Sequence, residues 1–500
     1  MIFKNLCKLM IASMIAKMRF RALVIAACAC LSSCGGGGSA PTPPPTVTAS
    51  PSTPVMATSV TLQTYERLAN VAYPALITSQ NATISTETVS AEIPKITEDY
   101  NQITIAKPGY IPIWYPYSPL DTAPIQVGLY RALPITKQVN FIKAIIPHDA
   151  GGWLIDYYKA GYFQSTVERI AAIGGNNVVY ADSAIIKSMD VSAKTVTLYG
   201  KYFPPDQALA DMASAAKARG VEFTFMIGIY PGDALGNDSW TVPKFYDAIS
   251  QLNNTDPFWD AWFSEYKKIL FERAALAQKL GASRFVIGFN LDYMVPRGHA
   301  RWADLIKAVQ AAGFTGKISY FGGTNGAYNG FLSIQNAKDR ADFVRLFDEI
   351  GLNFYNPVIP QPSEVLASDQ PRDRILSGLR TQVASVSTYG VPVFLLIGTP
   401  SVHTGVSSQD YIEPAFSCGD LKGYVRDYQV QADVYQAAAE LVNEQSGTSS
   451  SPIKGIFSWG YHYLDNPRKH QTAGDACYDF AASIRNKPAE AVLSYWFKGW

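Results

Sequence analysis

The chain has 500 residues, a length that suits two or three ordinary domains or one enlarged α/β barrel. Its 42 Lys and Arg residues nearly balance its 41 Asp and Glu residues, which excludes the strongly basic class of nucleic-acid-binding proteins. Aromatic residues are plentiful, with 29 Tyr and 9 Trp, and this fits either a large core or a pocket lined for sugars.

Residues 1–34 have the pattern of a bacterial lipoprotein signal. A basic stretch at 17–21 precedes the apolar run 22–31, and the segment ends in Leu31-Ser32-Ser33-Cys34. These last four residues resemble a lipobox, whose cysteine would carry a diacylglyceryl group and become the first residue of the mature chain. An uncleaved transmembrane helix is the alternative, but the apolar run is too short to span a bilayer comfortably. We therefore expect an exported protein, lipid-anchored through Cys34 in the cell envelope.

Two cysteines, Cys418 and Cys477, remain once the signal is removed and Cys34 is lipidated. In an oxidising compartment, two cysteines most simply form one disulfide. No clustered set of ligands with zinc spacing is present in the sequence, so we expect no metal site.

The next two segments differ in composition. Residues 35–58 are mostly Gly, Ser, Thr and Pro, cannot bury a core, and are predicted to form a disordered tether. Residues 59–140 contain short β-prone runs, such as 103–106 and 111–117, separated by Pro and Gly turns. We predict a small irregular or β-rich segment there, packed against the main domain.

From about residue 141 the pattern becomes an alternation of strands and helices. Strands are predicted at 143–147, 177–181, 222–229, 284–289, 317–321, 351–355, 391–397 and 455–459. Helices are predicted at 164–173, 205–219, 258–280, 299–312, 339–350, 374–388 and 424–443. Four helices are followed by a glycine that suits a helix C-terminus: Gly220, Gly281, Gly313 and Gly390. Eight strands separated by helices predict a (β/α)8 TIM barrel over residues 141–500.

Several segments in this region follow the arrangement of a known family. They are 258–266, Ala274 with Leu276 and Ala277, 287–288, Trp302 with Leu305 and Ile306, 316–320, 350–355 and 455–459. In order and spacing they resemble glycoside hydrolase family 113, the β-mannanase-type barrels of the retaining clan A. The resemblance covers roughly residues 141–465 and implies a TIM barrel with a carbohydrate ligand.

The resemblance also locates the family's two catalytic positions in this sequence. The general acid/base would be a Glu after Ile-Gly-x at the end of strand four, where this chain has Asn290. The nucleophile would be a Glu before x-Gly at the end of strand seven, where this chain has Leu396. Retaining hydrolysis requires two carboxyl groups roughly 5 Å apart, so the standard mechanism is not expected here.

Other carboxylates offer an alternative catalytic pair. Asp292 lies two residues beyond Asn290 and, by strand alternation, would face the same side. A partner carboxylate would come from Asp149, Asp182 or Asp233, which follow strands one to three. Aspartates at such positions also cap helices and pin loops routinely. His403, Asp410 and Glu413 on the loop after strand seven are weaker candidates.

A non-catalytic interpretation rests on aromatic residues at or beyond strand ends, where their rings can stack on sugars. These residues are Trp153, Tyr320, Tyr355 and Trp459, with Asn290 as an uncharged hydrogen-bonding group. The sequence thus leaves two functions open: a divergent glycosidase working through Asp292, and a glycan-binding lipoprotein without catalysis. No nucleotide-binding or zincin motif occurs in the sequence, so we expect no cofactor, and we expect a monomer.

The lipobox makes a testable prediction. Cys34→Ala removes the thiol that would carry the lipid, so the variant should move from the membrane fraction to the soluble fraction. Fractionation of cells expressing either form, followed by immunoblotting, measures this. Continued membrane association of the variant would contradict the lipobox assignment.

Overall fold

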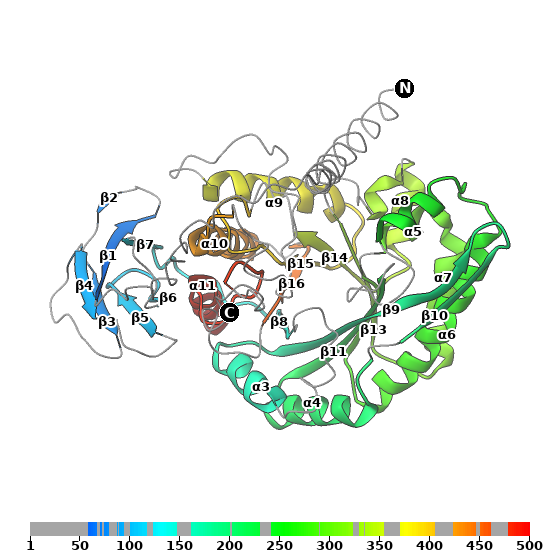
Figure 1. The fold of residues 1–500 in the computed structure, drawn as a ribbon, viewed down its shortest axis with the longest axis horizontal. Helices are drawn as coiled ribbons and strands as arrows, with labels where there is room; N and C mark the ends of the chain where they lie inside the picture. The colour runs from blue at the N-terminus through cyan, green and yellow to red at the C-terminus, as the bar shows by residue number, and fades with distance from the viewer. Residues whose placement is uncertain are drawn as a thin grey trace, which may run out of the picture. The chain divides into compact units, whose positions relative to one another are not determined.

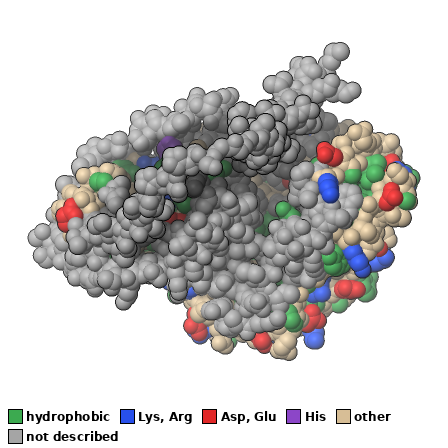
Figure 2. Space-filling view, viewed as in Figure 1, with side chains coloured by type: hydrophobic (Ala, Val, Ile, Leu, Met, Phe, Trp, Pro, Cys, Tyr) green, Lys and Arg blue, Asp and Glu red, His purple; other side chains and the backbone are tan. Residues whose placement is uncertain are grey.

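The computed structural model describes most of the chain after residue 58. The described residues are 59–67, 71–72, 75–79, 88, 90–94, 101–117, 124–147, 162–200, 203–230, 242–289, 291–323, 330–334, 336–354, 371–405, 424–446, 451–461 and 479–500. All of them belong to one compact unit, residues 56–500. Acidic and basic side chains are interspersed over the described surface seen in Figure 2.

The segment that precedes the barrel is β-rich, as predicted. One sheet contains β2 (Val71–Ala72), β1 (Ser59–Glu66) and β4 (Ser90–Pro94), with β7 (Ile125–Leu129) parallel to β1. A second sheet has the order β3 (Leu76–Ser79), β5 (Asn101–Ala106) and β6 (Ile113–Tyr117). Alternate residues such as Ile103 and Ile105 are fully buried, because a strand places every second side chain on one face.

Eight parallel strands then close into a barrel (Figure 1). They are β8 (Ile142–Ile146), β9 (Asn177–Asp190), β11 (Glu222–Tyr230), β12 (Arg284–Phe289), β13 (Lys317–Gly323), β14 (Glu349–Phe354), β15 (Val393–Ile397) and β16 (Ile453–Trp459). Parallel pairing of β16 with β8 completes the ring. The predicted (β/α)8 barrel is confirmed, and each predicted strand overlaps an observed one.

The helices between the strands are α3 (Tyr162–Ala172), α4 (Asp206–Ala218), α5 (Val242–Ile249), α6 (Phe258–Lys279), α7 (His299–Ala311), α8 (Ala337–Val344), α9 (Pro371–Ser387), α10 (Tyr428–Gln445) and α11 (Pro488–Gly499). The short 3-10 helices η1 (Asp292–Arg297) and η3 (Gly330–Ser333) follow β12 and β13. Gly220, Gly281, Gly313 and Gly390 all have positive φ, from 66° to 89°, which confirms their predicted role at helix ends.

Several element boundaries differ from the prediction by a few residues, and two larger differences have a tertiary cause. The helix expected at 339–350 ends at Val344, because Glu349 belongs to β14. There the Glu349 carboxylate accepts a hydrogen bond from Arg284 Nε at 2.5 Å. The strand expected to end at 181 continues to Asp190, because its second half pairs with the antiparallel β10 (Thr195–Tyr199) as a hairpin outside the ring. The sequence prediction also omitted α5 and α11.

Helix α10 is buried along nearly its whole length, although a barrel helix normally exposes one face. The N-terminal strands cover its outer side: Gly128 in β7 donates its N–H to Gln429 Oε1 at 3.0 Å. Arg67 after β1 donates to Asp433 from Nη2 at 2.6 Å and from Nε at 3.1 Å, and Tyr130 OH donates to Asp433 at 2.6 Å. Burial raises the pKa of the Asp433 carboxyl, although Arg67 acts in the opposite direction.

Among the described residues, none of the helices combines the length and apolar character needed to cross a membrane.

The Arg67–Asp433 pair yields a stability prediction. Arg67→Ala leaves a fully buried carboxylate without its cation, which should lower the free energy of unfolding by about 3–5 kcal/mol. The matched control is Arg219→Ala, which breaks the exposed Arg219–Glu168 pair and should cost less than about 1 kcal/mol. Urea unfolding of both variants measures the difference. Equal losses would contradict a structural role for the N-terminal strands.

Candidate functional site

Side chains at the C-terminal strand ends define the mouth of the barrel, where barrel enzymes place their sites. Phe289 ends β12 and Trp459 ends β16, on opposite sides of the ring, and their rings stack at a centroid distance of 5.0 Å and an angle of 26°. This contact crosses the barrel interior. Trp459 is 6% exposed, so the predicted sugar-stacking residue is packed against another ring in this state.

A bulge in β12 helps Phe289 point inward. The register between β12 and β13 shifts between Val286 and Gly288, so Ile287 is the extra residue. Tyr266 OH from α6 donates to the Ile287 carbonyl at 2.8 Å and fixes the bulge. Val286 and Phe289 therefore both belong to the interior cluster, although strict alternation would place them on opposite faces.

Leu396 lies near the end of β15, the seventh strand of the barrel, and is fully buried in the barrel interior. It belongs to the same cluster as Phe289 and Trp459 and pairs in register with Asn353 of β14. Below it, the rings of Phe394 and Phe457 lie 5.2 Å apart. A hydrocarbon side chain in an apolar cluster offers no nucleophile for an anomeric carbon.

Asp292 does not lie where the sequence argument put it. Strand β12 ends at Phe289 and Asp292 begins the 3-10 helix η1, so strand alternation does not apply. The Asp292 carboxylate is 7% exposed and accepts a hydrogen bond from Tyr320 OH at 2.7 Å. A Cβ atom added to Gly322 would point at both the Asp292 carboxylate and the Tyr320 ring, so these two groups lie on the same side of β13. The carboxylate therefore faces the helical layer.

Tyr320 also requires a correction. Its ring is fully buried, 5.4 Å from Trp302 of α7 and 5.5 Å from Phe343 of α8 in edge-to-face contacts. Neither face is open for a sugar, because β13 directs Tyr320 outward into the helical layer while its neighbour Phe321 points inward. Burial, together with the charge of Asp292, raises the pKa of the Tyr320 hydroxyl, so Tyr320 is a neutral phenol that donates a hydrogen bond to Asp292.

The other sequence candidates are less informative. Asp182 lies within β9 rather than after it, with its backbone in register with Ile227, and its side chain lies outside the described part. His403 follows β15, and its Nδ1 lies 3.4 Å from Asp427 Oδ2 just before α10. The other candidates lie outside the described residues: Asn290, Asp149, Trp153, Tyr355, Asp233, Asp410, Glu413, and the cysteines Cys34, Cys418 and Cys477. Within the described ranges, no group of three or more His, Cys, Asp or Glu side chains could hold a metal ion.

One polar cluster beside the ends of β15 and β16 was missed by sequence reasoning. Lys487 Nζ donates to Ser401 Oγ at 2.7 Å and to the Ala481 carbonyl at 3.0 Å, and Lys487 is 1% exposed. Gln431 of α10 donates to the Thr399 and Ala482 carbonyls at 2.8 and 2.9 Å. A Lys beside a helix-starting Pro gives no sequence signal of burial, because only the fold brings 401, 431 and 487 together.

The fold defines the broad class of (β/α)8-barrel proteins, and comparison with known proteins identifies the family. The profile of Glycoside Hydrolase Family 113 matches residues 156–480, more than half of the chain. The chain therefore belongs to glycoside hydrolase family 113, and a carbohydrate ligand follows from that membership.

Solved structures share the fold at low identity. A complex of a family 113 β-1,4-mannanase has 20% identity and a TM-score of 0.50, covering 72% of this chain and 99% of that chain. A second family 113 β-1,4-mannanase has 19% identity, the same TM-score and the same coverage. The β-mannanase AaManA from Alicyclobacillus acidocaldarius has 18% identity and a TM-score of 0.49, with 72% and 98% covered. No curated protein sequence matches the chain.

The Lys487 cluster makes a pH-dependent prediction. Burial lowers the Lys487 pKa from 10.5 to about 7, with Asp479 acting against this and Arg426 adding to it. The folded state therefore favours neutral Lys487, and its stability falls as pH drops from about 10 to about 7, then levels off. Lys487→Met removes the titrating amine and therefore this pH-dependent loss of stability. As pH drops from about 10 to about 7, the free energy of unfolding of the wild type should fall relative to that of the variant by about 1.4 kcal/mol per pH unit.

Urea unfolding at pH 7, 8, 9 and 10 measures the difference between the two proteins. Lys217→Met on α4 is the control, because that side chain is exposed and its substitution should give a difference that does not vary with pH. A constant difference between wild type and Lys487→Met would show that Lys487 is not held neutral in the folded protein.

Proposed function

We propose that this protein binds a glycan at the mouth of its family 113 barrel and does not hydrolyse it by the two-glutamate retaining mechanism. The observation that carries the proposal is that Leu396, which the sequence resemblance aligns with the nucleophile, is fully buried among apolar side chains of the barrel interior. At the acid/base position the sequence has Asn290, whose amide cannot protonate a leaving oxygen. Neither half of the carboxylate pair is then present.

The environment of Asp292 favours binding over divergent catalysis. A general acid must reach the leaving oxygen of the substrate, whereas this carboxylate accepts a hydrogen bond from Tyr320 OH at 2.7 Å in the helical layer. A nucleophile must reach the substrate, and this carboxylate is turned toward Tyr320 and Gly322. Both observations support Asp292 as a group that fixes η1 to β13.

The aromatic pair at the mouth supports the carbohydrate part of the proposal. Phe289 and Trp459 lie at two opposite strand ends and stack on each other, each 6% exposed, so a sugar would contact the exposed edges of this pair. Solved family 113 neighbours are described as β-1,4-mannanases, so we infer that β-mannans are the first ligands to test. We further infer that the protein works in the cell envelope, anchored through Cys34, with Cys418 and Cys477 bonded in that oxidising compartment.

The decisive experiment measures binding and cleavage in parallel. Purified protein should be retarded in native gels that contain glucomannan or galactomannan, and should release no reducing ends from them above background. Trp459→Leu should weaken binding at least tenfold, because a buried Trp anchor contributes about 2 kcal/mol or more. Circular dichroism of the variant checks that the barrel is intact.

Asp292→Asn distinguishes the two functions left open by the sequence. Binding should be unchanged, because the amide keeps the acceptor for Tyr320 OH. If the wild type cleaves a β-mannan and Asp292→Asn abolishes cleavage, the protein is a divergent glycosidase and the binding proposal is wrong. Cleavage with retention that survives Asp292→Asn would mean that the catalytic carboxylates lie elsewhere and that the alignment of strands four and seven is wrong.

A further inference from the structure

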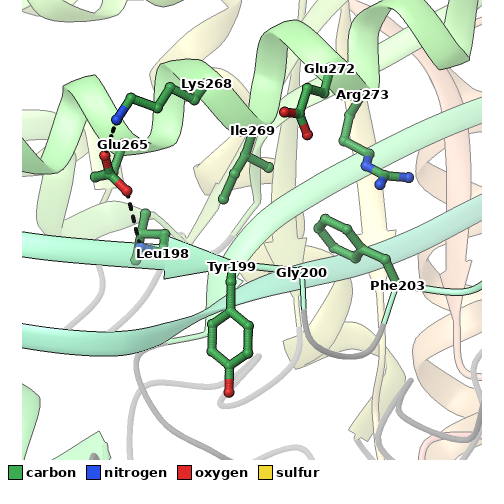
Figure 3. A pocket seen from close by; sticks show the side chains of 9 residues that line it. All are labelled: Leu198, Tyr199, Gly200, Phe203, Glu265, Lys268, Ile269, Glu272 and Arg273. Atoms are coloured by element: carbon green, nitrogen blue, oxygen red, sulfur yellow. Dashed lines mark hydrogen bonds and ion pairs between the residues drawn. The ribbon is translucent and has the colours of Figure 1, made fainter.

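A pocket of about 330 Å³ opens on the outer wall of the barrel, between α6 and the end of β10 (Figure 3). Its floor is formed by Leu198, Gly200 and Ile269. None of its lining residues belongs to the interior cluster that contains Phe289 and Trp459, so the pocket is separate from the barrel mouth. It exists because β9 extends beyond the ring and returns as β10 against α6.

The polar groups of the pocket come from one face of α6. Glu265, Lys268, Glu272 and Arg273 project from this helix above the end of β10 in Figure 3. Lys268 pairs with Glu265, and Glu265 Oε2 also accepts the Leu198 N–H at 3.4 Å. These two contacts hold the carboxylate and the ammonium at the pocket edge, and they tie the helix to the edge strand.

The Arg273 guanidinium is packed against a ring, and two of its N–H donors make no hydrogen bond. Its guanidinium lies 4.5 Å above the Phe203 ring, and Nη1 is 3.5 Å from Asp206 Oδ1, too far for a good hydrogen bond. Nε and Nη1 are both shielded from solvent and donate no hydrogen bond. The Arg273 side chain as a whole is 17% exposed, so its guanidinium is a cationic group that a ligand oxygen in the pocket can contact.

The charges select the ligand class. The carboxylates of Glu265 and Glu272 would repel a phosphate or other anion. The positive charges of Lys268 and Arg273 would repel a metal cation. The four charges sum to zero, which suits a neutral ligand that offers many donors and acceptors together. Sugar hydroxyls have this property, because each can donate to a carboxylate and accept from an ammonium or guanidinium group.

We propose that this outer-wall pocket is a second carbohydrate site, which holds a neutral glycan segment away from the barrel mouth. Glu272 and Arg273 provide the acceptor and the donor for its hydroxyls, and Ile269 lies beneath the ring. Gly200 is required for the shape, because a Cβ there would lie 2.0 Å from the Phe203 ring and displace the ring that supports Arg273. The inference depends on family membership for the ligand class and is independent of whether the mouth hydrolyses or binds.

The test uses affinity electrophoresis of the full chain in native gels containing glucomannan, galactomannan or soluble xylan. Trp459→Leu serves as the background, because it disables the mouth and leaves the pocket. In that background, Arg273→Ala should raise the apparent Kd about tenfold through loss of charge-assisted hydrogen bonds. Gly200→Ala keeps every polar group but displaces Phe203, and should weaken binding similarly. Lys267→Ala, on the same helix but outside the pocket, is the matched control and should change nothing.

The outcomes separate the two sites. Retardation that persists in Trp459→Leu and falls with Arg273→Ala and Gly200→Ala supports the pocket. Retardation that Trp459→Leu abolishes overturns the pocket and leaves the proposed function intact. If Trp459→Leu binds but Arg273→Ala and Gly200→Ala behave as Lys267→Ala does, the pocket is likewise overturned. If no gel retards the wild type, both proposals fail.

Discussion

The closed barrel must fill its own interior, and this constraint governs most of the structure. At the base, Arg284 and Glu349 form a buried ion pair, and Ser319 donates to Glu349 at 3.1 Å. Above them lie Phe321, Phe394 and Phe457, with the Phe321 and Phe457 rings 4.9 Å apart. At the top are Leu396 and the stacked Phe289 and Trp459. Apolar packing thus extends from the base to the strand ends where chemistry would occur.

The consequence for function follows from what a packed interior excludes. A retaining site needs two ionisable groups whose surroundings separate their pKa values, and such groups require polar partners. Here three of the buried carboxylates have structural partners. Asp292 binds Tyr320, Glu349 binds Arg284, and Asp433 binds Arg67, each beside a specific donor. In the proposed function, a sugar contacts the exposed edges of the stacked Phe289 and Trp459 rings at the mouth, and the charged outer-wall pocket is a different kind of surface.

The repeating part of the fold was predictable because it has a repeating pattern. Strands such as Arg284–Phe289 and helices such as Phe258–Lys279 agree with prediction within one residue. The misses occur where a tertiary partner decides. Glu349 reads as the end of a helix but lies in a strand beside Arg284. Helix α10 has polar residues on every side, and they are buried because the N-terminal strands cover it.

The sequence by itself determined the barrel and the β-rich segment before it, because periodicity and local order are written along the chain. Only the tertiary structure decided where the side chains at the strand ends point. The bulge at Ile287 turned Phe289 inward, and the end of β12 placed Asp292 in η1 beside Tyr320. The Lys487 cluster and the pocket at Arg273 join segments that are distant in sequence. Such contacts depend on how elements cross in space, and no local pattern records that.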